Sequence, residues 1–577
     1  MTDQAQKPTP GGAEALPGGD GATDGGAAQP YRRSRRSAPR LGPFKLSPVV
    51  ELEEAERRRR ARRAAAGVIL GMVLFAAVYG LLSWLKYRAY MDARFDLGNM
   101  VQAVYNTAHG HFLEITTGEA QPRQMSRLGS HVDPVLALFA LPWLVWPSPT
   151  MLLVLQAAIV ATGAWPAYRL GARVLRDPRA GGLLAGAYLL YPALGFLVLN
   201  EFHPVALATP LLLWAFLYVE EGRWLWAAPF LVLAAACKET VPLVIALMGL
   251  YFALRKRSLW PLVLTALAGA YFVVAVWVII PHYNGDQSAF IARYGQYGSG
   301  AADVVKHAVT HPAQTVTDLT SPSNLTYWLH LLWPLGFVSL LSPLTVLVAA
   351  PEYLLNGLSS IGFQRRIEFH YTALEIPFLF AAAVLGLARL WRWLGGAVWR
   401  KEKAMRGELV SRGTLALLVL LCALAGNYFL GPLPFSLPGA AVDGHDYAKS
   451  SHDAVLDEAV AMIPADVPVS VNNNVGAQLA ARAVSYVFPY YATADWVIVD
   501  TRHPWFYDKE QTVLHEQALA RLVLDRDFQN VFAQDGVYVF KRIAPGPGVT
   551  TPGAAPDAGA TASPAPSGST APATPAP

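Results

Sequence analysis

The sequence has few cysteines and few charged residues. Cys237 and Cys422 are its only cysteines, and both lie inside apolar segments. This excludes a disulfide framework and a thiolate metal cluster. Only 15% of the 577 residues are charged, whereas 53% are hydrophobic and the mean hydropathy is +0.30. That composition is too apolar for a soluble protein of this size, so we predict an α-helical polytopic membrane protein.

A cleavable secretory signal is also missing, because the first apolar run begins only near Ala64. The net charge of +5 and the pI near 9.0 do not indicate a nucleic-acid partner, because the basic residues cluster beside apolar segments. This is the pattern of cytoplasmic loops in membrane proteins. The block from Arg57 to Arg63 directly precedes the apolar run Ala64 to Leu85. It predicts a cytoplasmic N-terminus and an extracytoplasmic loop after the first span.

The chain divides into four parts by composition. We predict a disordered cytoplasmic tail at residues 1–62, a transmembrane domain at 63–431, an extracytoplasmic α/β domain at 432–544, and a disordered Pro- and Ala-rich tail at 545–577. Apolar segments predict about eleven transmembrane helices in the plasma membrane. Because this number is odd, the C-terminus is predicted to be extracytoplasmic.

The polar connection at residues 87–134 is unusually long for a membrane domain. It carries several acidic residues and histidines, among them Asp96, His131 and Asp133. Long loops without a packing role are usually functional, so we predict that this loop forms a catalytic rim with Asp96 at its centre. The segment after Asp133 is shorter than the roughly 20 residues needed to cross a bilayer. We interpret it as an interfacial or re-entrant helix.

Further ionisable residues lie at the outer ends of other apolar segments, where burial is costly and function is the default interpretation. With the loop residues they form the set Asp96, His131, Asp133, Glu201, His203, Lys238, Glu239, Glu352 and His370. We predict that these side chains, from distant parts of the chain, converge on one cavity.

Glycosyl transfer from a lipid-phosphate donor requires a base, cations and an apolar groove. A carboxylate deprotonates the acceptor hydroxyl, and Asp96 fits this role. Cations neutralise the departing phosphate, a role for Lys238, His203 and either Arg123 or Arg127. The substrate-binding residues are predicted to be Glu201, His203, Lys238, Glu239, His370 and Tyr371.

Each of these patterns has a structural alternative. Asp96 precedes Leu and Gly, which is also typical of a turn or a helix cap. His131 and Asp133 are spaced to share a divalent metal such as Mg²⁺ or Mn²⁺, but an aspartate before Pro134 also caps turns.

Two further residue patterns leave the same choice open. His203 is either a phosphate contact or an interfacial cap of the following helix. Lys238 and Glu239 are either substrate contacts or a structural ion pair.

The motifs RFDLGN, HVDP, EFHP, CKE and EFHY, taken together, resemble a family of multi-pass membrane proteins of unknown function. The resemblance extends from about Ala64 to Arg542 and includes the VNNNVGAQL and ADWVIVD segments. The layout is also similar to the type C glycosyltransferase fold of protein mannosyltransferases and lipid A aminoarabinose transferases. This second resemblance implies a catalytic role for Asp96 and a phosphate-binding role for Lys238. The chain lacks the mannosyltransferases' Asp-Glu pair directly after the first span.

Three functions are therefore compared. The leading one is a glycosyltransferase that moves a sugar from a polyprenyl-phosphate donor, held among membrane lipids, to an envelope acceptor. The second is a lipid or solute transporter or flippase, which requires polar residues at mid-membrane in broken helices. The third is a non-enzymatic envelope scaffold. Charged residues at the ends of apolar segments, rather than inside them, favour the first.

Overall fold

The computed structural model describes residues 48–118, 122–285, 289–398, 411–433, 444–504, 508–509 and 512–543. The predicted tail at 545–577 lies outside these residues. Contacts divide the chain into two units, and the second, Arg57–Pro577, contains the sites described below. Helix α1 extends over Pro48–Arg88, so the prediction of a disordered tail is wrong for residues 48–62. These residues are rich in Glu, Ala and Arg, which favour helix.

Helices dominate the part of the chain up to residue 430. After α1 and the loop, they are α4 (Pro149–Ala161), α5 (Ala164–Val174), α6 (Pro178–Leu189), α7 (Pro192–Leu199), α8 (Pro204–Glu220), α9 (Trp224–Ala235), α10 (Val241–Lys256), α11 (Leu262–Val274), η4 (Ala275–Ile279) and α12 (Ile280–Asn284). Then follow η5 (Ala289–Tyr297), α13 (Ala301–Thr310), α14 (Pro312–Leu319), α15 (Pro322–Leu332), η6 (Trp333–Leu335), η7 (Val338–Leu341), α16 (Pro343–Val346), η8 (Leu347–Ala349), α17 (Ala350–Leu358), η9 (Gly362–Arg365), η10 (His370–Thr372), α18 (Ile376–Val398) and α19 (Arg412–Leu430).

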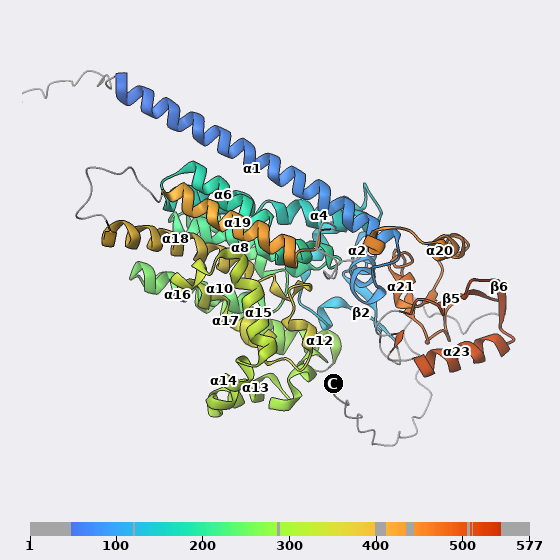
Figure 1. The fold of residues 1–577 in the computed structure, drawn as a ribbon. Coiled ribbons are helices and arrows are strands. Elements are labelled where there is room, and N and C mark those ends of the chain that lie inside the picture. Colours follow the sequence, from blue (N-terminus) through green and yellow to red (C-terminus); the bar gives the residue numbers. More distant parts are fainter. Residues whose placement is uncertain are drawn as a thin grey trace, which may run out of the picture. The chain divides into compact units, whose positions relative to one another are not determined.

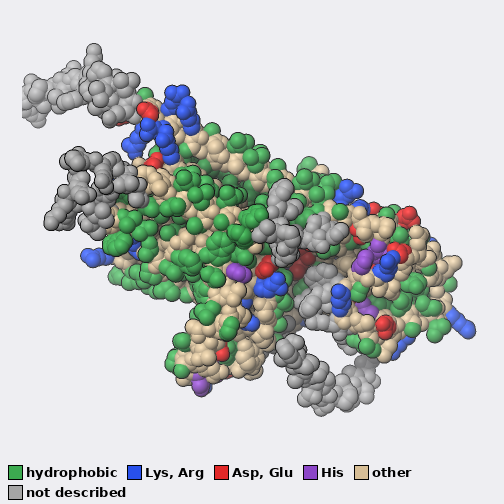
Figure 2. Space-filling view, in the orientation of Figure 1, with side chains coloured by type: hydrophobic (Ala, Val, Ile, Leu, Met, Phe, Trp, Pro, Cys, Tyr) green, Lys and Arg blue, Asp and Glu red, His purple; other side chains and the backbone are tan. Residues whose placement is uncertain are grey.

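Several of these helices can cross a membrane. Among the described residues, five are long and apolar enough, or six if α6 and α7, which bend by 46° at their break, form one span. Figure 2 shows a largely hydrophobic surface over the helices, with charged side chains gathered at its margins. The chain is therefore a mostly helical, polytopic membrane protein, while the count of eleven spans stays a prediction.

Buried apolar side chains hold the helices together. One large core contains aromatic and aliphatic residues of α4 to α10, α18 and α19. Within it, α6 lies beside α19, and α8 beside α18 (Figure 1). The segment after Asp133 forms two short helices, η3 (Pro134–Phe139) and α3 (Ala140–Trp143), instead of a span. Pro142 lies within α3 and lacks the N–H that a longer helix would need.

The loop at residues 87–134 is folded. It contains η1 (Arg94–Gly98), α2 (Asn99–Ala108), a hairpin of β1 (Glu114–Thr116) and β2 (Gln124–Ser126), and η2 (Arg127–Gly129). Apolar side chains of α2, such as Val101 and Val104, are fully buried in the core of the membrane domain. The loop is thus anchored by packing, and its polar residues are held in defined places.

Residues 444–543 form a small α/β structure around one mixed sheet. Its elements are η11 (Gly444–Tyr447), α20 (Ser451–Ala461), β3 (Val469–Val471), α21 (Asn473–Gly476), β4 (Ser485–Val487), β5 (Trp496–Asp500), α23 (Thr512–Leu524), β6 (Phe528–Gln534) and β7 (Val537–Arg542). The strand order is β4-β3-β5-β7-β6, in which β3 is parallel to β4 and β5, and β7 is antiparallel to its neighbours. Separate apolar clusters lie on the two faces.

Candidate active site

A cavity of about 320 Å³ lies where the folded loop meets the ends of the membrane helices. Its walls come from the loop, from the connections before α8 and α10, from η5 and η10, and from Val487 of β4. The predicted residues in its wall are Asp96, Arg127, His131, Asp133, His203, Lys238, His370 and Tyr371, whereas Arg123 does not line it. The structure thus brings these side chains together. Glu201, Glu239 and Glu352 do not line the cavity.

Asp96 lies on η1, a single π-helical turn. Such turns are rare and frequent at functional sites. The carboxylate of Asp96 faces His203, whose Nε2 is 3.5 Å from Oδ1 of Asp96. The side chain of Asp96 is 27% exposed and that of His203 only 6%. Asp96 is therefore open to a ligand from the cavity, while His203 supports it from the buried side.

The orientation of His203 is fixed by its other ring nitrogen. Nδ1 donates a hydrogen bond of 2.7 Å to the carbonyl oxygen of Asn200, so Nε2 is the nitrogen that faces Asp96. The backbone N–H of His203 donates to Oε1 of Gln156, 2.9 Å away on α4. Gln156 is fully buried, and it holds this turn in place.

A second histidine stacks on the first. The ring centres of His370 and His203 are 3.7 Å apart. His370 donates from its backbone N–H and its Nδ1 to Oδ1 of Asn200, at 3.1 and 3.0 Å. Burial, together with nearby His203 and Lys238, holds the pKa of His370 well below its usual value. His370 is therefore a neutral ring at physiological pH.

Lys238 and Arg293 supply positive charge to the cavity. The Nζ of Lys238 and the guanidinium of Arg293 lie 6.0 and 5.9 Å from the ring centre of Tyr371. Neither cation has a carboxylate oxygen within ion-pair distance among the residues that the structure describes. Unpaired cations in a confined space are suited to bind an anion such as a phosphate.

Other ionisable side chains of the wall pair with side chains of the protein itself. Nε of Arg127 donates to Oδ2 of Asp133 at 2.8 Å, and Nδ1 of His131 lies 2.9 Å from Oε1 of Glu239. Burial raises the pKa of Asp133 to about 6, although Arg127 opposes this. His131 and Asp133 thus each have a protein partner, and their shared metal stays a prediction.

Glu239 and Glu201 lie behind the wall of the cavity. Oε2 of Glu239 accepts from the N–H of Val132. Burial alone would raise the pKa of Glu239, but His131 and Lys238 outweigh it and lower the pKa to about 2. Oε2 of Glu201 accepts from the N–H of Leu97 at 2.7 Å. Through these contacts the two glutamates position neighbouring residues of the site. Substrate binding by either glutamate stays a prediction.

Arg94 is a residue of the site whose role the sequence did not indicate. Its side chain is 1% exposed, and its guanidinium donates to Oε1 of Gln102 at 2.7 Å and to the carbonyl oxygen of Ser485 at 2.8 Å. Gly476 also contacts it, because a Cβ at that glycine would lie 2.2 Å from Cβ of Arg94. Arg94 therefore joins η1 to the α/β structure. The only signal in the sequence is an arginine two residues before Asp96.

The α/β structure has a further group of possible metal ligands. Donor atoms of His452, Asp500 and His503 lie within 4.8 Å of one another. Both ring nitrogens of His452 contact carboxylates, with Nε2 3.1 Å from Asp500 and Nδ1 2.9 Å from Asp535. His452 and Asp500 thus belong to an ion-pair network, and His503 contacts it through a backbone N–H bond to Oδ1 of Asp500.

A family model, described as "Predicted membrane protein (DUF2079)", matches residues 88–539. The chain belongs to this family. The match includes the folded loop, every wall residue of the cavity and most of the α/β structure. The predicted membership in a family of membrane proteins of unknown function is confirmed. A comparison with curated proteins finds no match.

Proposed function

We propose that this DUF2079 protein is a membrane glycosyltransferase that uses a polyprenyl-phosphate sugar as its donor. The observation that carries the proposal is the convergence of Asp96, His203 and Lys238, from three separate chain segments, on one cavity. The cavity combines a partly exposed carboxylate with unpaired cations. These are the groups that transfer from a phosphate leaving group requires.

In the proposed reaction, Asp96 takes the proton of the acceptor hydroxyl. The hydroxyl oxygen forms a bond to the anomeric carbon while the bond from that carbon to the donor phosphate oxygen breaks. The electron pair of the broken bond stays on the phosphate, which leaves as polyprenyl phosphate. Lys238 and Arg293 stabilise the negative charge that grows on this oxygen. His203 orients Asp96 from the buried side of the cavity.

The proposal extends to the fold and the orientation. We infer a type C glycosyltransferase-like arrangement of about eleven spans, with the cavity on the outer face of the plasma membrane. Short helices before α4, a folded first loop and a terminal α/β structure support this. The basic segments at the opposite helix ends, such as Arg255 to Arg257 at the C-terminal end of α10, support the same orientation.

The test is transfer of labelled sugar in membranes supplied with polyprenyl-phosphate sugars. D96N removes the base and keeps the side chain's shape, so we expect a loss of about 100-fold or more. E458Q removes an exposed carboxylate on α20 and is the matched control. Unchanged transfer by a folded D96N protein would remove Asp96 from the mechanism. No transfer by the unaltered protein with any such donor would reject the donor class.

A further inference from the structure

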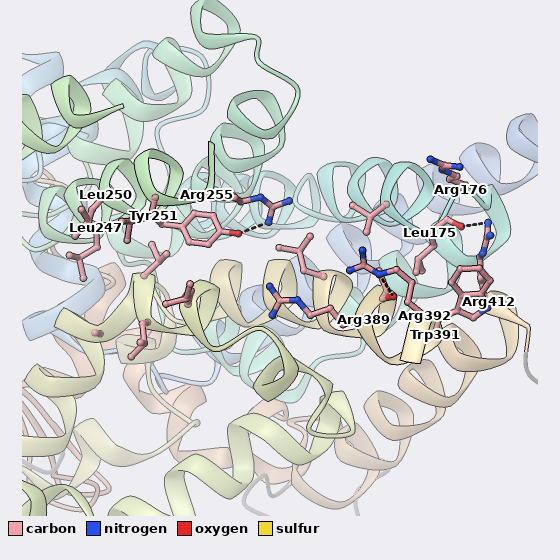
Figure 3. A pocket seen from close by; sticks show the side chains of 18 residues that line it. Leu175, Arg176, Leu247, Leu250, Tyr251, Arg255, Arg389, Trp391, Arg392 and Arg412 are labelled. Carbon is pink, nitrogen blue, oxygen red and sulfur yellow. Dashed lines mark hydrogen bonds between the residues drawn. The ribbon is translucent and has the colours of Figure 1, made fainter. Parts of the chain in front are cut away.

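A second and larger cavity, of about 960 Å³, lies among α10, α16, η8, α18 and the turn after α5. Figure 3 shows Tyr251 and Arg255 at one end of this hollow, Trp391 and Arg412 at the other, and Arg389 between them. None of the residues in its wall belongs to the candidate active site.

One part of this wall is apolar and open. It contains leucines of α10, α16 and η8, and Leu250, Leu254, Leu344 and Leu347 are exposed. Leu254, for example, is 63% exposed. In a membrane domain, exposed leucines face hydrocarbon chains. This side of the hollow is therefore suited to hold the tail of a lipid.

The other part of the wall is strongly basic. Its arginines are Arg176, Arg255, Arg389, Arg392 and Arg412, and no aspartate or glutamate lines the hollow. Arg255 pairs with Glu220 at 2.6 Å. In the described part of the chain, the other four have no carboxylate within ion-pair distance.

Backbone contacts hold several of these arginines in place. Arg412 donates to the carbonyl oxygen of Leu175 at 2.8 Å, and its guanidinium lies 4.0 Å from the ring centre of Trp391. Arg392 donates to the carbonyl oxygen of Ala388 at 3.2 Å. These bonds leave several N–H groups of each guanidinium free, since an arginine has five. The result is a preformed concentration of positive charge beside an apolar wall.

The two cavities lie at opposite ends of shared helices. Lys238 of the first cavity precedes α10, and Arg255 of the second lies near its C-terminal end. Helix α10 has 16 residues, which corresponds to a length of about 24 Å. Likewise, Tyr371 precedes α18, whereas Arg389 and Arg392 lie in its later turns. The second cavity is therefore close to the other membrane surface.

We propose that this hollow is a binding site for one anionic phospholipid, with its phosphate among Arg389, Arg392 and Arg412 and its acyl chains along the leucines of α10 and η8. Basic pockets between membrane helices on the cytoplasmic side bind anionic head groups. The charge of the wall selects an anionic over a zwitterionic head group, and the open leucine face selects a lipid over a free phosphate. The inference is independent of the proposed enzymatic function.

The experiment uses the full-length protein in phosphatidylcholine nanodiscs that contain a minority of phosphatidylglycerol. Native mass spectrometry then measures how many phosphatidylglycerol molecules stay bound. R389Q/R392Q should weaken retention about 10-fold or more. R179Q/R257Q removes one arginine at the start of α6 and one directly after α10, neither of which lines the hollow, and it should retain the lipid. Size-exclusion profiles verify that each variant is folded.

Two further arms separate the possible occupants. L250Q/L254Q keeps every arginine but makes the lipid-facing wall polar, so it should also weaken lipid retention. Excess inorganic phosphate should not displace the lipid. The proposal is overturned if phosphatidylcholine is retained equally well, if inorganic phosphate displaces the bound lipid, or if both double-arginine variants lose it to the same extent.

Discussion

The Nε2 atom of His203 lies 3.5 Å from Oδ1 of Asp96, and these residues are joined by no local sequence relationship. Asn200 fixes the ring through Nδ1, so the free nitrogen faces the carboxylate. The ring therefore fixes where the carboxylate lies on the buried side of the cavity. The proposed reaction therefore depends on this pair.

Replacing His203 should impair catalysis more than folding. We expect H203A to lower the rate of sugar transfer about 10- to 100-fold, because Asp96 loses its orienting partner. The measurement is the initial rate with labelled donor in membranes with equal amounts of each protein. H111A, an exposed histidine of the same loop, should leave the rate unchanged. Equal losses in both variants would argue against the pair.

Removing the charge of Lys238 should act on the transition state. K238Q is expected to lower kcat about 100-fold, with a smaller change in KM, because the leaving phosphate gains charge as the bond breaks. Kinetics with varied donor concentration separate the two constants. K306Q, at an exposed lysine of α13, is the matched control. A change in KM alone would assign Lys238 to ground-state binding.

Asp92 should make the folded protein less stable as the pH rises. Its side chain is 1% exposed, and burial raises its pKa from 3.8 to about 6, with Asp96 adding to this and Lys86 opposing it. The folded state thus keeps a proton that the unfolded state has released, and stability falls between about pH 4 and 6. The loss amounts to about 3 kcal/mol at neutral pH.

The variant D92N has no such proton to lose. Its thermal midpoint relative to the unaltered protein should therefore rise from about pH 4 to about pH 6 and then level off. D466N, which removes an exposed carboxylate, controls for the loss of one negative charge. A difference between D92N and the unaltered protein that stays constant over this range would contradict the assignment.

The sequence predicted which residues line the cavity better than it predicted what each of them contacts. Asp96, His203 and Lys238 were found because ionisable residues at the ends of apolar segments are costly to bury. Arg94 was missed because its partner, Ser485, is 391 residues away, and no local pattern reports such a pairing. Glu201 was predicted to bind substrate because sequence shows charge, whereas its bond to the N–H of Leu97 depends on the tertiary fold.

For secondary structure, too, the local sequence predicted some elements, whereas others depend on tertiary contacts. The β-branched and aromatic segments SYVFP, WVIVD and VYVFKR are typical of strands, and β4, β5 and β7 lie there. The segment VGAQLAAR has helical spacing, but the only helix there is the short α21, Asn473–Gly476, which includes just its first two residues. Gly476 packs against Arg94 at this point. The close approach of another segment, rather than helix propensity, determines the backbone there.

A methyl group at Gly476 should therefore separate the two parts that Arg94 joins. The Cβ of G476A would lie 2.2 Å from Cβ of Arg94, and a clash of this size with a buried side chain costs about 1–3 kcal/mol or more. We expect a lower thermal midpoint and faster proteolysis of residues 444–543. G269A, whose Cβ meets no atom within 4 Å, should be neutral or slightly stabilising. Equal behaviour of both variants would contradict the packing.

The bond between Arg94 and Ser485 also has a consequence for biosynthesis. Ribosomes make the chain from its N-terminus, so Asp96 and its neighbours emerge long before the strand that anchors them. Until Ser485 has been translated, Arg94 lacks two of its hydrogen-bond acceptors, the hydroxyl and the carbonyl oxygen of that serine. A nascent or truncated polypeptide that ends before β4 would insert its helices without completing the wall around Asp96, which delays any reaction until the last domain has been made.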